Sequence, residues 1–199
     1  RKEIENMKKV LVIVDMQNDF VDGALGTPEA QAIVPKVADY IRTHANKDTV
    51  LVFTKDTHEV NYMDTQEGKN LPVEDCIKGT SGHGIVDEVF GAYCCKDFMD
   101  PWVVYPIADT NPLKIEKPSF GSLELQDILW TMHTADHPIE EITLMGLCTG
   151  ICVMSNAILA KATLPEVPVN VVADCCACVT PESHKTALEA MKLCQINII

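Results

Sequence analysis

The chain has 199 residues, of which 47% are hydrophobic, and this length suits one well-buried core better than two. Its formal net charge of −13 comes from 16 basic and 29 acidic side chains. Such a charge disfavours nucleic acid or an anionic membrane as a partner, because either would be repelled at long range. We therefore expect a small-molecule partner.

The chain carries no segment that resembles a signal peptide or a membrane span. Residues 1–9 are mostly charged, and no apolar run approaches the ~20 residues that are needed to cross a bilayer. We expect a cytoplasmic protein, with residues 1–8 as a polar lead-in and residues 9–199 as one domain. The nine cysteines are odd in number and several lie in apolar segments, which favours free thiols. The Cys175–Cys178 spacing has no second pair nearby, so we predict no metal or redox role for it.

Apolar runs alternate with helix-like periodicity along the chain. The runs predict strands at residues 10–14, 49–54, 113–117, 139–147, 167–173 and, at the edge, 195–199. The periodic segments predict helices at residues 28–45, 85–93, 122–133, 150–162 and 182–193. This alternation indicates an α/β fold with three αβα layers around a doubly wound, mainly parallel sheet.

Two segments do not fit the alternation. Residues 56–82 are polar and rich in Gly and Pro, and are too long for an ordinary connection, so we interpret them as a functional loop. Residues 94–111 stay unassigned, although Val103 and Val104 favour a short strand. Residues 102–107 are apolar and are a candidate interface if the protein is a homo-oligomer.

Polar residues gather where the predicted strands end. Asp15, Asp56 and Lys117 end or follow strands, and Cys152 lies in the first turn of a helix that follows another strand. Ligands of doubly wound sheets bind beyond the carboxyl ends of the strands, so these four side chains are expected to share one site.

Cys152 is the candidate nucleophile, because the N–H groups and the positive dipole end of a helix start favour a thiolate and can hold an oxyanion. No histidine near a strand end suggests a Cys–His pair, so Asp15 is the candidate base and Lys117 the charge partner. Taken singly, each residue has an ordinary alternative: a structural cysteine, a turn cap and a surface lysine.

Three motifs together carry a family resemblance. Asp15–Phe20 (DMQNDF) resembles the opening motif of the isochorismatase-like cysteine hydrolases, the superfamily of nicotinamidases and N-carbamoylsarcosine amidases. Glu116–Phe120 (EKPSF) is similar to its lysine segment, and Gly146–Val153 (GLCTGICV) to its nucleophile turn. The motifs occur in family order, and the resemblance runs from Lys9 to the final helix.

The resemblance implies roles for the residues that match. Asp15 would be the general base and acid, Lys117 the electrostatic partner and Cys152 the nucleophile. A cis peptide before Cys148 would let the backbone N–H groups of Cys148 and Cys152 form an oxyanion hole. Phe20 would form an apolar wall against a planar substrate.

The nucleophile turn departs from the family pattern at one position. Gly150 stands where many relatives have Asp. We expect this difference to change local hydrogen bonding without loss of activity.

The long loop resembles the start of a metal site. Asp56-Thr-His58 resembles the D-x-H pair of nicotinamidases, and Glu67 lies where some of them supply a carboxylate. The segment around Asp75 is similar to one that supplies a further histidine, but here that position is Asp. The resemblance implies one divalent metal (Zn, Mn or Fe) and no organic cofactor, with the extra oxygen ligand favouring harder ions. Alternatively, Asp56 and His58 only anchor the loop. We expect His83 to face solvent.

The function that the resemblance implies is hydrolysis of a small carboxamide, nicotinamide first, to a carboxylate and ammonia through a thioester. The alternatives are an isochorismatase-type hydrolase of vinyl ethers, an N-carbamoyl amine hydrolase and a non-catalytic binding protein. The presence of Cys152 counts against the vinyl-ether reaction, which needs no thiol, and the intact set of three residues counts against a silent protein. The lack of a G-x-G-x-x-G or Walker loop gives no support to a nucleotide-dependent enzyme.

Overall fold

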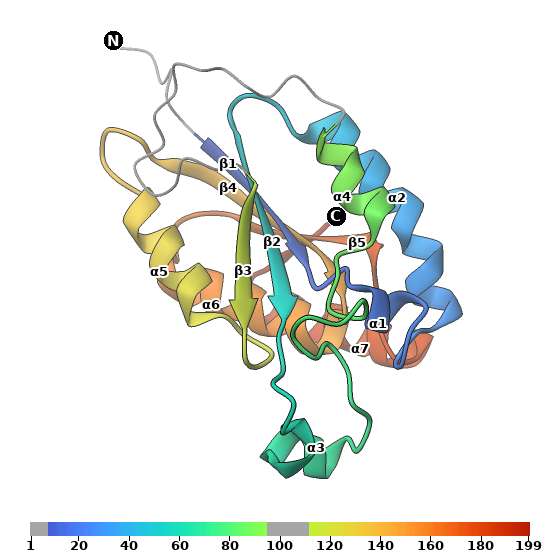
Figure 1. Ribbon diagram of the computed structural model, residues 1–199. Helices are drawn as coiled ribbons and strands as arrows, with labels where there is room; N and C mark the ends of the chain where they lie inside the picture. The colour runs from blue at the N-terminus through green and yellow to red at the C-terminus, as the bar shows by residue number, and fades with distance from the viewer. Residues whose placement is uncertain (1–7, 95–111) are drawn as a thin grey trace.

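Six strands form one all-parallel sheet in the computed structural model of the protein, which describes residues 8–94 and 112–199 (Figure 1). The strand order is β3-β2-β1-β4-β5-β6, and every pair of neighbours is parallel. The strands are β1 (Lys8–Val14), β2 (Thr49–Asp56), β3 (Leu113–Lys117), β4 (Ile139–Leu147), β5 (Val169–Ala177) and β6 (Asn197–Ile198). The predicted three-layer α/β fold is confirmed, and the sheet is parallel throughout the described residues.

Helices pack on both sides of this sheet. In Figure 1, α2 packs with α4 on one side, while α5 packs with α6 on the other. The α-helices are α1 (Asn18–Val21), α2 (Pro28–His44), α3 (Gln66–Asn70), α4 (Asp87–Cys94), α5 (Leu123–Met132), α6 (Met154–Thr163) and α7 (Pro181–Leu193). A 3₁₀ turn, η1 (Tyr62–Asp64), precedes α3, and a π-helical turn, η2 (Thr149–Val153), leads into α6.

Short polar side chains fix the starts of the main helices. The Thr27 hydroxyl accepts from the backbone N–H of Ala30 at the start of α2, and the Ser122 hydroxyl accepts from that of Leu125 at the start of α5. Thr180 and Ser183 form a reciprocal capping box at α7. These bonds satisfy N–H groups that have no partner inside the helix, which explains why the predicted helix starts are close to the observed ones.

Some boundaries differ from the predictions. Strand β1 begins at Lys8, one residue inside the predicted lead-in, and β5 runs on to Ala177, well beyond the predicted residue 173. The register between β4 and β5 shifts between Leu144, which pairs with Val171, and Gly146, which pairs with Cys176, so pairing resumes beyond the polar Asp174. The strand suggested by Val103 and Val104 and the candidate interface at residues 102–107 lie outside the described residues.

Close packing of the backbone aligns the strand ends. The central strand β1 is buried from Val10 to Val14, and Val14 is in register with Thr54 of β2 and Gly146 of β4. A Cβ at Gly146 would lie 2.1 Å from the Val14 carbonyl oxygen, and its φ is +124°, so only glycine fits there. The residues that follow these strands consequently meet at one edge of the sheet.

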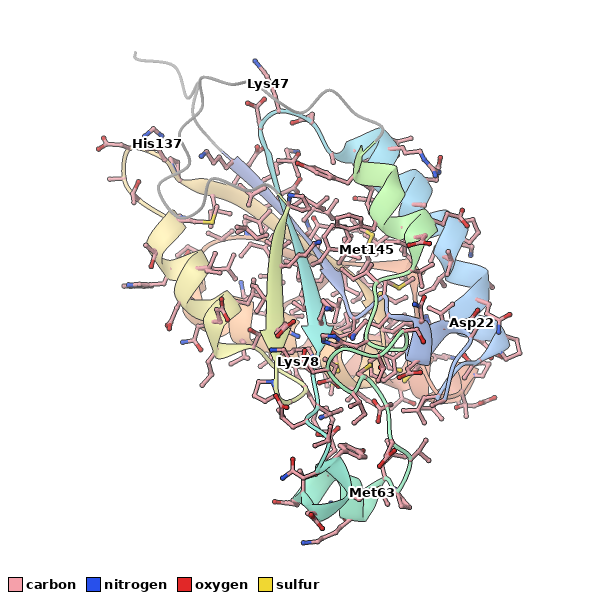
Figure 2. All side chains as sticks on the ribbon, viewed as in Figure 1. Asp22, Lys47, Met63, Lys78, His137 and Met145 are labelled. Carbon is pink, nitrogen blue, oxygen red and sulfur yellow. The ribbon has the colours of Figure 1, made fainter. Side chains whose placement is uncertain are left out.

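The long loop projects from that same edge. Figure 1 shows η1 and α3 as a lobe beyond the carboxyl ends of β2 and β3, and Met63, labelled in Figure 2, lies on this lobe. Thr65 caps α3 by accepting from Gly68 N–H, so the predicted loop contains short helices. In the part of the chain that the structure describes, no helix is long and apolar enough to span a bilayer.

Candidate active site

The structure brings Asp15, Lys117 and Cys152 into contact at the carboxyl edge of the sheet. Asp15 directly follows β1 and has a left-handed backbone, with φ +47°. Lys117 is the last residue of β3 and is in register with Asp56 of β2. Cys152 lies in η2, which begins two residues after the end of β4. Three side chains separated by up to 137 positions along the sequence thus share one small volume.

Lys117 is the electrostatic centre of this group. The residue is only 1% exposed, and its Nζ lies 2.7 Å from Asp15 Oδ2, 3.6 Å from Asp56 Oδ1 and 3.5 Å from Cys152 Sγ. Burial alone lowers the pKa of Lys117, but the surrounding acidic groups, Asp15 foremost, outweigh it and raise the pKa above its ordinary value. The ammonium therefore stays charged at neutral pH.

Burial dominates the chemistry of the Cys152 thiol. The residue is 4% exposed, and burial followed by the Asp15 charge raises the pKa of Cys152 well above its ordinary value, against the opposing effect of Lys117. The thiolate expected from the helix start is thus not the resting form. A protonated thiol needs a base at hand, and Asp15 and Cys152 belong to a cluster whose ligand atoms all lie within 4.8 Å of one another.

Thr54 orients the Asp15 carboxylate. The Thr54 hydroxyl donates to Asp15 Oδ1 over 2.7 Å, while the other carboxylate oxygen, Oδ2, faces Lys117. The sequence gives no sign of this role, because Thr54 is one more β-branched residue at the end of a buried strand. The two contacts hold the carboxylate in one orientation beside the thiol.

The nucleophile turn has the backbone form that the family resemblance implies. The Leu147–Cys148 peptide is cis, and the Cys148 carbonyl accepts from the N–H groups of Ile151 and Val153 over 3.0 and 3.2 Å. The N–H groups at a helix start point toward the space in front of it, where an oxyanion can accept them.

Helix α7 supports this turn from behind. Thr149 Oγ1 lies 2.7 Å from His184 Nδ1 of α7, a contact that the sequence did not predict. A Cβ at Gly150 would lie 3.2 Å from Ala187 Cβ, so the lack of a side chain at Gly150 lets α7 pack closely. The position that departs from the family pattern is therefore a packing contact between α7 and η2.

A cavity of about 220 Å³ opens onto the thiol. Most of its lining is apolar, and Phe20 and Phe120 lie on its wall together with Cys148 and Cys152. Acidic side chains, Asp56, Glu67 and Asp75, line it as well. The remaining lining residues are Leu25, Thr27, Ala30, Leu71, Leu147, Ile151, Cys178 and Val179. Such a cavity suits a small, flat molecule that presents a carbonyl group to Cys152 and a basic atom to the carboxylates.

The four residues named for a metal converge on one point. His58 Nε2 lies 3.6 Å from Asp56 Oδ2, 3.9 Å from Asp75 Oδ2 and 4.0 Å from Glu67 Oε1. His58 Nε2 and Asp75 Oδ1 are buried, and neither has a hydrogen-bond partner among the described residues. Buried polar atoms without partners are costly, and a divalent cation would satisfy them.

The charges of this cluster also fit a cation. Burial, against the opposing charge of Lys117, raises the pKa of Asp56 to about 6. Burial together with the neighbouring carboxylates raises the pKa of Asp75 to about 7. Burial lowers the pKa of His58, which keeps its imidazole neutral and able to coordinate. One nitrogen and carboxylate oxygens are ligands that zinc, manganese and iron all accept.

His83 corrects the expectation that it faces solvent. It is 5% exposed, with Nε2 2.8 Å from Thr57 Oγ1 and Nδ1 3.3 Å from Lys55 Nζ. Gln17 Nε2 donates to the carbonyl oxygens of both His83 and Asp56. These bonds tie the loop around Asp56 to the start of α1.

Two charged residues, Lys78 and Glu116, lie at the rim of this network, where Glu116 Oε1 is 3.8 Å from Lys55 Nζ and 4.0 Å from His83 Nε2. Figure 2 shows Lys78 near the ends of β2 and β3, where its Nζ donates to Glu116 Oε2 over 2.7 Å. Cys175 and Cys178, like the other cysteines whose side chains the structure describes, are free thiols and form no disulfide.

The fold and the grouping of a thiol, a carboxylate and an ammonium define a hydrolase class that the comparisons with known proteins identify. The family model "Isochorismatase domain" matches residues 9–199, and the chain belongs to this family of hydrolases. Nicotinamidase of Saccharomyces cerevisiae is 24% identical over 186 residues, covering 76% of this chain and 81% of the relative. An uncharacterized isochorismatase family protein, PncA of Bacillus subtilis, is 30% identical over 159 residues, covering 76% and 78%.

The solved structures agree with this family. Pyrazinamidase of Pyrococcus horikoshii in complex with zinc has a TM-score of 0.73 and 27% identity, and the match covers 96% of this chain and 98% of that one. The family is thereby established, and the chain is similar to a nicotinamidase and to a pyrazinamidase.

Proposed function

We propose that the protein is an amidohydrolase that converts a small aromatic carboxamide, nicotinamide first, into the carboxylate and ammonia. One observation carries the proposal. Lys117 Nζ lies 2.7 Å from Asp15 and 3.5 Å from Cys152, where the thiol faces a mainly apolar cavity of about 220 Å³. The nicotinamidase and pyrazinamidase among the related proteins support an amide as substrate.

The first half of the reaction forms a thioester. Asp15 takes the proton of the Cys152 thiol as the sulfur attacks the amide carbon, and Lys117 stabilises the negative charges that remain. The backbone N–H groups of Cys148 and Cys152 would hold the developing oxyanion. Asp15 then gives its proton to the departing nitrogen, which leaves as ammonia.

The second half releases the acid. Asp15, now an anion again, takes a proton from a water molecule that attacks the thioester carbon. The tetrahedral intermediate collapses with expulsion of the Cys152 sulfur, which recovers its proton from Asp15. The ammonium of Lys117 keeps the carboxylate and the sulfur close together through both halves.

The aromatic side chains of the cavity wall favour a substrate with a flat ring. Phe20 and Phe120 line the cavity and offer apolar surface to an aromatic ring. If a divalent metal is bound, Asp56, His58, Glu67 and Asp75 would hold it, and it would supply a Lewis acid for a lone pair on the substrate ring. The residues of the chain would still carry out every proton transfer.

Ammonia release from nicotinamide by the purified protein tests the proposal. We expect turnover by the wild type and none above background with Cys152→Ala, since the nucleophile is removed. The assay is run with EDTA and with added Zn, Mn or Fe. Lack of turnover by the wild type under every condition would refute nicotinamide as substrate. A panel of other carboxamides and N-carbamoyl amines would then test the wider class.

A further inference from the structure

A buried asparagine links the nucleophile turn to the segment that follows the catalytic lysine. Asn156 lies in α6, four residues after Cys152, and its side chain is 0% exposed. A buried amide is costly unless its hydrogen bonds are made. Its partners therefore indicate what this side chain does.

Both the donor and the acceptor of the Asn156 side-chain amide make hydrogen bonds. Nδ2 donates to the Cys152 carbonyl over 2.8 Å and to the Phe120 carbonyl over 3.1 Å. Oδ1 accepts from the Ser122 backbone N–H over 2.9 Å. One bond thus reaches the nucleophile residue itself, while two reach a turn more than 30 positions earlier in the chain.

That turn follows Lys117, and the lysine holds the end of the turn that Asn156 does not contact. Lys117 Nζ donates to the Ser119 carbonyl over 2.9 Å, in addition to its contact with Cys152 Sγ. At Gly121 an added Cβ would lie 2.8 Å from Leu159 Cδ1, so the turn packs directly against α6. The turn is therefore fixed between the ammonium of Lys117 and the amide of Asn156.

We propose that Asn156 is a positioning residue that sets the distance between Lys117 and Cys152 and holds Phe120 in the cavity wall. The three bonds close a ring of contacts from Cys152 through Asn156 to residues 120–122, and back through Lys117 to the sulfur. Asn156 touches no reacting atom, so it acts through the residues that do. As far as it concerns turnover, this role rests on the amidohydrolase function proposed above.

Two variants separate this role from general stability. Asn156→Thr keeps a hydroxyl that can bond to the carbonyl four residues earlier, which helices tolerate, but it is too short to reach residues 120 and 122. Asn156→Asp has the same size and keeps the acceptor for Ser122, but it loses both donors. Both variants release the turn, while the side chains of Asp15, Lys117 and Cys152 themselves are unaltered.

Asn170 provides the matched control. It is a buried asparagine in β5, with Nδ2 facing Glu141 Oε2 and Thr143 Oγ1 and with Oδ1 accepting from Asn197 Nδ2. It therefore makes side-chain bonds of the same kind, and its partners all lie outside the candidate site. Asn170→Thr should lower stability without a matching effect on the site.

The experiment measures kcat and KM on nicotinamide, the rate of Cys152 alkylation by iodoacetamide at one fixed pH, and the midpoint of thermal unfolding. We expect both Asn156 variants to lower kcat/KM by about 10- to 100-fold, the order of loss that follows a displacement of about 1 Å in a site. We also expect slower alkylation, because Lys117 no longer sits beside the sulfur. Asn170→Thr should change both rates less than about twofold.

The outcomes are distinguishable. Rates within about twofold of wild type in the two Asn156 variants would overturn the proposal, as would equal losses in Asn170→Thr at equal thermal stability. If the wild type does not hydrolyse nicotinamide, the function proposed above fails, and the alkylation rates alone decide the role of Asn156. If Asn156→Asp does not fold, Asn156→Thr decides it.

Discussion

Removal of the Lys117 charge should destabilise the protein strongly. At an effective dielectric constant of ~20, an ion pair at 2.7 Å, the Lys117–Asp15 distance, corresponds to about 6 kcal/mol of Coulomb attraction. Desolvation of both ions offsets much of this gain, so the intact pair adds little net stability. Lys117→Met removes one partner only and leaves Asp15 and Asp56 buried without a cation. We expect a loss of about 3–5 kcal/mol in the free energy of unfolding.

A double-mutant cycle tests this reasoning. Urea unfolding at pH 7 in EDTA is measured for the wild type, Lys117→Met, Asp15→Asn and the double variant. The double variant should be less destabilised than the sum of the two single losses, with a coupling free energy of about 1–3 kcal/mol. Additive losses, or a Lys117→Met variant within about 1 kcal/mol of wild type, would show that the pair is not buried and coupled as described.

Three further predictions concern the loop and the acidic cluster. His83→Leu should lower the free energy of unfolding by about 1–3 kcal/mol, because the buried contacts of the His83 ring with Thr57 Oγ1 and Lys55 Nζ are lost; unchanged urea unfolding would support the solvent-facing alternative. The raised pKa values of Asp56 and Asp75, about 6 and 7, mean that the metal-free folded protein binds protons that the unfolded chain does not. Its stability should therefore fall as the pH rises from about 4 to 7, and Asp75→Asn should flatten that decline in urea titrations with EDTA; an unaltered slope would contradict this. Asp75→His should raise the affinity for zinc relative to manganese in calorimetric titrations, since imidazole suits zinc; an unchanged preference would remove Asp75 from the ligand set.

Much of the fold follows from sequence patterns that act locally. The mainly apolar runs at residues 10–14 and 139–147 are typical of strands buried in a parallel sheet, and Ser122 and Thr27 mark helix starts by their chemistry. The grouping of Asp15 with Lys117 also follows, because parallel strands end at one edge of the sheet.

The supporting contacts could not be predicted in this way. Asn156, Thr54 and His184 act on residues 34 to 39 positions away, through side-chain packing that leaves no periodic signal. Asn156 in particular sits within an apolar helix, where a polar residue ordinarily indicates an exposed face. The wrong prediction for His83 has the same origin, because its burial depends on Thr57 and Lys55 of another segment.

The central claim is that Cys152 becomes acylated during turnover. The most direct test is acid quenching of the wild type during steady-state hydrolysis of nicotinamide, followed by intact-protein and peptide mass spectrometry. We predict a nicotinoyl thioester on Cys152 that forms at the rate of ammonia release or faster, and no adduct with Cys152→Ala. Turnover that proceeds at the same rate in Cys152→Ala would contradict the account.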